Sequence, residues 1–467
     1  MRAKKLFWPA VLFGFGSLAI VHTASGQSWT PQYTVPSESH AGIFCVKAVD
    51  ESTVWAGAGR GVYLRATDGG QNWTSGLVPG AELEDFYSIA AIDQNTAYFV
   101  SSHAAFPAPD ARIYKTTNGG QNWTLQYQNT EPGAYFNSIA FWDKDNGIAF
   151  SDPVGGSFLI VTTSNGGATW ERIPAANIPP PFPNEYGGFS DGGGTALAVE
   201  GTSNAWFGTS LGEPVRVFRT TDKGRTWTVA NTPLATTRPF WGIATIAFKD
   251  SLNGFAGGGS DFTLGTANNL IQTTDGGRTW TVVTSYAHRG LSTLVYVPNM
   301  NNLGLCATAK DGSIFSPDGG ATWNRIDQDS SYSALTFVSP TVGWAAGWAS
   351  GTSMIVKFNG NLATAVAERP TNKQPQGFDL AQNYPNPFNP ETRIKFQLPS
   401  VSWVRLEVIN LMGQHVATLL EGKRPAGEYE ITWDGRNDFG QSVSSGIYLL
   451  KMQAGKFSQT RKMVLTR

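Results

Sequence analysis

The 467-residue sequence is poor in the residues that build metal centres and disulfide frameworks. It has only two cysteines, Cys45 and Cys306, and its five histidines are scattered along the chain. A zinc site needs closely spaced Cys and His ligands, and no such spacing occurs. Cys45 lies in the first and Cys306 in the sixth of the repeats described below, so we expect two buried free thiols. The sequence predicts no metal and no cofactor.

A large charge of either sign is also missing. Lys and Arg number 34 against 35 Asp and Glu, a net charge of -1. This near neutrality argues against nucleic acid or an anionic membrane as the main partner.

Long apolar runs are missing after the first 26 residues. The run Leu6–Val21 follows a basic start and precedes the small residues 24–26, a pattern that predicts a signal peptide over 1–26. No later run approaches the ~20 residues that a bilayer span needs. We therefore expect an exported protein with no transmembrane segment after signal removal.

Glycine and aromatic residues, in contrast, are abundant, with 53 glycines and 12% aromatics, which is typical of many short strands joined by tight turns. The stretch Thr273–Trp280, with the sequence TTDGGRTW, occurs in six related copies, and such repetition predicts an array of similar units. An Asp or Asn before Gly-Gly favours a hairpin turn, and the Trp covers it. The key residues of the six boxes are Asp68 and Trp73, Asn118 and Trp123, Asn165 and Trp170, Asp222 and Trp227, Asp275 and Trp280, and Asp318 and Trp323.

Seven units of this kind follow one another, each opening with an apolar strand. The expected first strands are 44–49, 86–92, 136–142, 195–199, 243–248, 291–297 and 333–338. Four antiparallel strands per ~45 residues are typical of a propeller blade. We therefore predict an all-β chain in which residues 27–358 form a seven-bladed β-propeller.

The seventh unit has no box tryptophan and stops after the strand Met354–Phe358. Residues 28–33, SWTPQY, match 122–127, NWTLQY, which open the fourth strand of another unit. We expect residues 28–33 to supply the outer strand of the seventh blade, so that the two ends of the propeller close the ring.

The remaining residues predict a second, smaller domain. A segment with proline, glutamine and glycine, 359–377, is expected to be a linker. Alternating strands interrupted by turn signals follow over 378–467 and predict a small Ig-like β-sandwich.

The boxes resemble the Asp-box, or BNR, repeats of sialidases, sortilin-type receptors and photosystem II assembly factors of the Ycf48/Hcf136 type. In those families the box is an element of the fold and usually lies away from the ligand site. The resemblance implies a propeller and specifies no activity.

Residues 378–467 resemble a type A sorting domain of the type IX secretion system, which is related to FlgD-type Ig-like domains. The motifs that carry the resemblance are Tyr384–Pro390, Leu411–Gln414, Pro425–Gly427, Trp433–Gly435, Ser445–Tyr448 and Lys462–Leu465. The resemblance implies a bacterium of the Bacteroidota kind and passage through the periplasm and outer membrane by the type IX machinery. It also implies removal of this domain and a product that is secreted or held at the outer cell surface.

A ligand is expected on the face opposite the boxes, where the longer loops of the propeller lie. Aromatic rings, arginines and carboxylates in these loops suit a glycan or an extended peptide. The candidate binding residues are Tyr87, Arg112, Tyr135, Glu185, Tyr186, Arg238, Phe240, Trp241, His288, Arg289 and Tyr332. We expect binding of a glycan or of an extracellular or surface protein, and we assign no catalytic residue.

A secreted glycoside hydrolase on the same propeller is the alternative. Sialidases use several arginines to bind the carboxylate of the substrate, and Arg112, Arg238 and Arg289 come from different repeats of the expected ligand face. The sialidase family also has an Arg-Ile-Pro motif before its first box. The only such string in this sequence, at Arg172, follows the third box. Two-carboxylate glycosidases, such as the Asp-box xyloglucanases, need acids about 5–10 Å apart. The alternative stays open because several acids lie on the loop face and the sequence does not place any two of them together: Asp85, Asp110, Asp152, Glu185, Asp191, Glu213 and Asp261.

Overall fold

The computed structural model describes residues 27–35, 42–103, 111–129, 131–188, 195–234, 242–259, 268–286, 288, 290–300, 302–309, 311–328, 330–349, 351–364, 366–369, 377–424, 427–438 and 441–466. This part of the chain is almost entirely β-strand and turn, with only two short 3-10 helices. It contains no helix with the length and apolar character that a membrane span requires.

Up to residue 359, the described strands form seven antiparallel sheets, which we number in chain order. Sheet 1 has β2 (Ile43–Ala48), β3 (Val54–Ala58), β4 (Val62–Ala66) and β5 (Thr74–Leu77). Sheet 2 has β6 (Glu84–Ala91), β7 (Ala97–His103), β8 (Ala111–Thr116) and β9 (Thr124–Asn129). Sheet 3 has β10 (Phe136–Phe141), β11 (Gly147–Val154), β12 (Ser157–Thr163) and β13 (Glu171–Arg172).

The fourth to sixth sheets repeat this meander. Sheet 4 has β15 (Leu197–Glu200), β16 (Asn204–Ser210), β17 (Arg216–Thr220) and β18 (Thr228–Asn231), with an additional β14 (Tyr186–Gly187) paired to β16. Sheet 5 has β19 (Ile243–Phe248), β20 (Gly254–Gly258), β21 (Leu270–Thr273) and β22 (Thr281–Val282). Sheet 6 has β23 (Leu291–Tyr296), β24 (Leu305–Ala309), β25 (Gly312–Ser316) and β26 (Asn324–Arg325).

Sheet 7 joins the two ends of this part of the chain. It contains β27 (Ser330–Ser339), β28 (Val342–Ala349) and β29 (Thr352–Asn359), and its outer strand is β1 (Ser28–Thr34). β1 runs antiparallel to β29, with Ser28 opposite Asn359 and Trp29 opposite Phe358. The expected pairing of residues 28–33 with the last strand of the seventh unit is therefore present.

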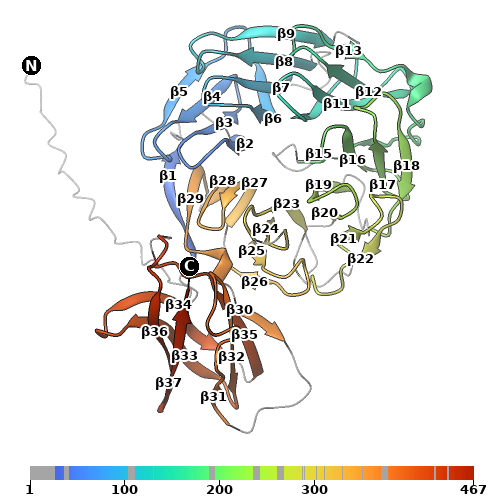
Figure 1. The fold of residues 1–467 in the computed structure, drawn as a ribbon. Coiled ribbons are helices and arrows are strands. Elements are labelled where there is room, and N and C mark those ends of the chain that lie inside the picture. Colours follow the sequence, from blue (N-terminus) through green and yellow to red (C-terminus); the bar gives the residue numbers. More distant parts are fainter. Residues whose placement is uncertain are drawn as a thin grey trace, which may run out of the picture.

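The sheets lie in chain order around a common centre (Figure 1). The first strands of neighbouring sheets contact one another in the order β2, β6, β10, β15, β19, β23, β27 and again β2. Seven clusters of buried apolar residues lie between consecutive sheets, including one that joins sheet 7 to sheet 1. Burial between sheets explains why every sheet has a run of fully buried residues, such as Val54–Ala58 in β3.

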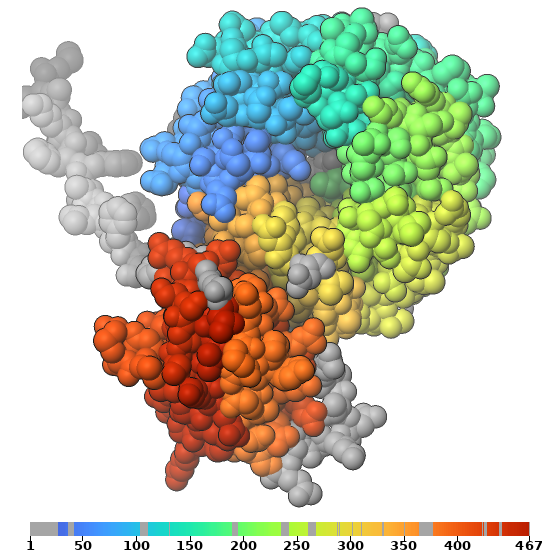
Figure 2. All heavy atoms as spheres, viewed as in Figure 1, coloured from blue at the N-terminus to red at the C-terminus, as the bar shows by residue number. Residues whose placement is uncertain are grey.

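Residues from β30 onward form a second lobe, coloured orange to red in Figure 2. Its two sheets have the strand orders β30-β35-β32-β31 and β34-β33-β36-β37, and they enclose one apolar core. The strands are β30 (Val366–Arg369), β31 (Asp379–Leu380), β32 (Thr392–Leu398), β33 (Ser402–Asn410), β34 (His415–Arg424), β35 (Gly427–Trp433), β36 (Gly446–Ala454) and β37 (Phe457–Leu465).

The segment expected as a linker, 359–377, is not wholly irregular. The short helix η3 (Leu362–Thr364) follows β29, and β30 pairs with β35 as an edge strand of the second lobe. The polar and proline-containing composition of 359–377 did not indicate this strand, because an edge strand needs few large apolar side chains.

Cys45 and Cys306 are both buried and free, as expected. Cys45 lies in β2 and Cys306 in β24, and burial raises the pKa of each thiol.

Candidate functional site

The six boxes share one hydrogen-bonded turn. In five of them a Thr or Ser hydroxyl contacts the Asp or Asn oxygen two residues later and accepts a hydrogen bond from the second Gly N–H. In all six the same Asp or Asn oxygen accepts the backbone N–H four residues further on. The two residues that follow have positive φ, including Lys223 in the fourth box. This geometry explains the Asx-Gly-Gly sequence, because positive φ favours glycine.

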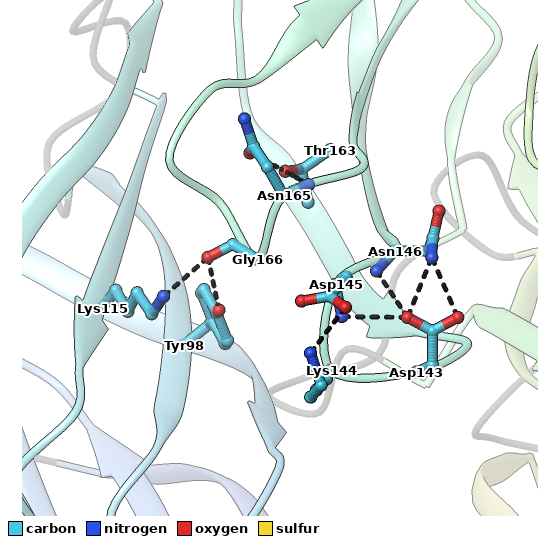
Figure 3. Close-up of polar contacts among 9 residues, drawn as sticks. All are labelled: Tyr98, Lys115, Asp143, Lys144, Asp145, Asn146, Thr163, Asn165 and Gly166. Atoms are coloured by element: carbon cyan, nitrogen blue, oxygen red, sulfur yellow. Dashed lines mark hydrogen bonds and ion pairs between the residues drawn. The ribbon is translucent and has the colours of Figure 1, made fainter.

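The turns also join neighbouring sheets. In the third box, the Gly166 carbonyl accepts hydrogen bonds from Tyr98 Oη at 2.7 Å and Lys115 Nζ at 2.6 Å, both in sheet 2 (Figure 3). The Gly166 N–H donates to the carbonyl of Asp145, in the turn between the first two strands of its own sheet. Asp143 caps that turn by accepting the N–H groups of residues 145 and 146.

Equivalent contacts occur elsewhere on this face. Tyr63 Oη donates to the Gly120 carbonyl, Trp206 Nε1 to Gly276, and Lys357 Nζ to Gly69. The oxygen atoms of the boxes thus accept hydrogen bonds from the same turn and from the neighbouring sheet. These hydrogen bonds hold the sheets together and leave the box oxygens little capacity to bind a ligand.

The opposite face begins with a repeated irregularity in the first strands. In six of the seven sheets, the pairing of the first two strands shifts by one residue close to the start of the first strand. The extra residues are Phe44, Tyr87, Asn137, Ala244, Ser292 and Ser333. Such bulges re-aim a side chain and are common beside functional sites.

Four aromatic side chains lie near one another on this face, and two of them, Phe44 and Tyr87, are bulge residues. The ring centroids of Phe44 and Tyr87 are 5.2 Å apart, and those of Tyr87 and Tyr135 are also 5.2 Å apart. A Cβ added at Gly42 would lie 3.2 Å from Phe44 and 3.7 Å from the exposed Trp348. Phe44, Tyr87 and Tyr135 therefore form a row across sheets 1, 2 and 3, and Trp348 of sheet 7 lies near its Phe44 end, beside Gly42. We call these four residues the aromatic row.

Two carboxylates border the aromatic row. Asp85 Oδ2 accepts a hydrogen bond from Tyr87 Oη at 3.2 Å, and its Oδ1 accepts the Arg60 N–H at 3.1 Å. Asp152 Oδ1 accepts Asn137 Nδ2 and the Gly187 N–H, each at 2.9 Å.

Burial shifts the proton affinities of this region. It raises the pKa of Asp152 to about 6, against hydrogen bonds that lower it, and raises that of Tyr87 to about 12. The pKa of Tyr135 also lies well above its usual value, through burial and then through the nearby Tyr87, Asp152 and Asp85. Both carboxylates therefore lie within electrostatic reach of Tyr135.

Glu185, expected to face a ligand, instead points into the protein. It is only 2% exposed, and Arg216 Nε donates to its Oε1 at 2.9 Å while Arg216 Nη2 pairs with Oε2. The guanidinium also lies 3.8 Å from the Phe182 ring centroid. The expectation of a solvent-facing Glu185 is therefore corrected: a buried acid needs a paired cation, and this pair holds the loop before β14. Its neighbour Tyr186 is exposed, as expected.

Tyr332 of β27 is also buried, with its ring 5.9 Å from that of Trp29 in β1, so it packs within sheet 7 and does not line the face. Arg112 is largely buried and lies 3.3 Å from Glu84 Oε1. These two side chains, like Glu185, belong to the packing of the sheets.

His288 contacts a separate polar cluster in sheet 6. Its Nδ1 lies 3.2 Å from Arg325 Nη2 and 3.4 Å from Asp311 Oδ2. Burial lowers the pKa of His288 against the opposing effect of Asp311. A neutral imidazole that accepts from an arginine is a structural partner of that arginine.

Four candidate residues, Arg238, Phe240, Trp241 and Arg289, lie outside the described residues. Within the described ranges, no group of three or more His, Cys, Asp or Glu side chains has the arrangement of a metal site. Phe44 and Trp348 are members of the aromatic row that sequence reasoning missed. Phe44 occupies the same place in its repeat as Tyr87, and that alignment was the available signal.

Residues 383–457 match the FlgD Ig-like domain family. No curated protein matches the chain.

Solved structures match most of the chain. YCF48 from Cyanidioschyzon merolae matches with TM-score 0.51 and 17% identity, over 71% of this chain and 99% of that one. The GH74 xyloglucanase from Xanthomonas campestris matches with TM-score 0.50 and 14% identity, over 79% of this chain and 59% of that one. A YCF48 structure with a bound D1 peptide has TM-score 0.49, 16% identity and coverage of 71% and 94%.

The fold thus defines a β-propeller protein that carries a FlgD-type Ig-like domain at its C-terminal side. The chain is similar both to YCF48 and to a GH74 xyloglucanase, so the fold alone leaves the activity undecided.

Proposed function

We propose that the seven sheets are the blades of a closed Asp-box propeller and that this propeller is an exported binding protein. The apolar cluster between sheets 7 and 1 and the pairing of β1 with β29 support closure. Residues 1–26 act as its signal peptide, and 27–358 are the propeller.

The ligand is a glycan or a protein, bound without chemical change on the face opposite the boxes. The observation that carries this proposal is the aromatic row, whose four side chains come from consecutive sheets and lie beside a repeated bulge. Aromatic side chains with a partly exposed face are the usual means of holding a sugar ring or an extended peptide.

The test uses the secreted protein on a panel of polysaccharides and sialylated glycans, with retention and released sugar measured in the same wells. Retention without release supports a binding propeller. Silence in both measurements directs the search to a protein partner, which a pull-down from the cell surface identifies.

Glycoside hydrolysis is the second candidate, and one specific observation favours it. Asp152 has a pKa raised to about 6, as a general acid requires, and Asp85 lies near the same tyrosine. Sugar release that Asp152→Asn abolishes, while retention of the polymer persists, would establish this activity and displace the binding proposal.

The C-terminal domain, 378–467, serves as a type IX sorting signal in this proposal. The match of 383–457 to an Ig-like family of the FlgD type supports the fold that such signals have. The protein then reaches the exterior through the periplasm and is secreted or held at the outer surface. Expression of the full chain and of a chain ending at residue 377 in a Bacteroidota host tests the assignment. Equal amounts of both in the medium would contradict it.

A further inference from the structure

The aromatic row is built into the fold and is not a chance group of exposed rings. Two of its members, Phe44 and Tyr87, are bulge residues of adjacent first strands. Glycines provide the space that the row needs: a Cβ at Gly42 would press on Phe44, and one at Gly59 would lie 2.8 Å from Asp85 Oδ1 and 3.4 Å from Phe44. The polypeptide therefore holds the rings and one carboxylate in fixed relative positions.

The geometry of the rings distinguishes between possible ligands. The planes of Phe44 and Tyr87 meet at 34°, and those of Tyr87 and Tyr135 at 39°. A cage for a single cation needs aromatic walls that face one point from different sides. A row of rings with modest tilts, continued towards Trp348, instead offers successive surfaces to a ligand that extends across several sheets.

The carboxylates beside the aromatic row further restrict the class of ligand. Asp85 and Asp152 border it, and ionised carboxylates accept hydrogen bonds and repel negative charge. Sugar hydroxyls can donate to these oxygens while the C–H faces of the sugar rings pack on the aromatic side chains. Sialylated or uronic-acid polymers would bring their own carboxylates to the same place.

We propose that the aromatic row is the binding site for a neutral glycan chain, which runs from Trp348 of sheet 7 across Phe44 and Tyr87 towards Tyr135 of sheet 3. The proposal rests on the binding function proposed above and names both its site and its ligand class.

The test is affinity electrophoresis of the full chain. It measures how far the protein is retarded in gels that contain a neutral β-glucan or mannan, polygalacturonate, or no polymer. A lysine-rich peptide is tested separately by fluorescence anisotropy. Trp348→Ala is the informative variant because this side chain is 48% exposed and its loss does not open the core. Trp403→Ala is the matched control, since Trp403 is 56% exposed and lies in β33 of the other domain.

We expect one neutral polymer to retard the protein, Trp348→Ala to weaken that binding about tenfold, and Trp403→Ala to leave it unchanged. Asp85→Asn should narrow the preference for neutral over acidic polymer, because it removes charge and keeps an acceptor for the Arg60 N–H. A thermal melt of each variant confirms that the fold is intact.

Three results would overturn the inference in distinguishable ways. Neutral-polymer binding that Trp348→Ala leaves unchanged would keep the binding function and reject the aromatic row as its site. A preference for polygalacturonate that Trp348→Ala weakens would keep the aromatic row as the site and reject the neutral glycan as its ligand. Binding of the lysine-rich peptide that Trp348→Ala weakens would have the same meaning. Failure to bind any of these probes would reject both the neutral glycan and the glycan form of the proposed function.

Discussion

Asp152 illustrates how one side chain links burial to acidity. Its pKa is raised from 3.8 to about 6, so between these values the folded state binds more protons than the unfolded state. Stability should therefore fall as pH rises from about 4 to about 6, and above that range the charged carboxylate opposes folding.

Asp152→Asn should remove this penalty, because an amide oxygen can still accept the N–H groups of Asn137 and Gly187. We expect the variant to be more stable than the parent at pH 7 by roughly 1–3 kcal/mol, and similar to it near pH 4. Urea unfolding at both pH values measures the difference. An effect that is the same at pH 4 and pH 7 would show that charge is not its cause.

Asp275 provides a control of opposite sign. Burial acts to raise its pKa, but hydrogen bonds from Thr279, Thr273 and Arg278 lower it to about 2. Its stabilisation is present above its unfolded pKa of 3.8 and is lost as pH falls through about 2. Asp275→Asn should therefore weaken the protein at pH 7, with a deficit that shrinks in strong acid.

The candidate binding residues on the face opposite the boxes show which features could be predicted from the sequence and which could not. Tyr87 and Tyr135 were predicted and are brought together, because the repeat fixes which end of each strand they occupy. Glu185 was misjudged because its partner, Arg216, comes from a strand 31 residues away, and no local pattern reveals a buried ion pair.

At the scale of the element, the box turn makes the most specific prediction. Five boxes have a Thr or Ser whose hydroxyl receives the second Gly N–H, but the first box has Ala66 at this position. Ala66→Thr should supply the missing hydroxyl and raise the free energy of unfolding by about 0.5–1.5 kcal/mol.

The matched control is Ala66→Val, which adds nearly the same volume without the hydroxyl. Thr116→Ala makes the reverse change in the second box and should destabilise the protein by a similar amount or more. If Thr and Val at residue 66 were equally stabilising in denaturant titrations, packing and not hydrogen bonding would explain the gain.

Strands were predicted well because they repeat, and exceptions arise where the repeat is broken. Each of the seven expected first strands overlaps an observed one, and β32–β37 lie within 378–467, where alternating strands were expected. β14 lies in a segment read as loop, since two residues paired to the end of β16 leave no periodic pattern. The bulges are likewise invisible in a single repeat, because an extra residue changes pairing without changing composition.

At the scale of the whole molecule, the proposed closure of the propeller depends on one short strand. Trp29 in β1 packs against Tyr332, Phe337 and Phe358 and donates to Ser313 Oγ at 2.8 Å. Deleting residues 28–34 should lower the melting temperature by roughly 10 °C, since it removes a half-buried indole and leaves β29 with an unpaired edge.

A synthetic peptide with the sequence of residues 28–34 should restore part of the loss when added to the shortened protein. The same peptide with alanine at the Trp29 position is the control and should restore little. An unchanged melting temperature after the deletion would contradict closure by this strand.

The pairing of β1 with β29 has a consequence for the order of events in folding. Ser28 of β1 lies opposite Asn359 of β29, so β1 remains without this neighbour until the strands of all seven sheets have been synthesised. Contacts so distant in sequence form late and slowly. Sheet 7 can therefore be completed only after the strands of the other six sheets have been made.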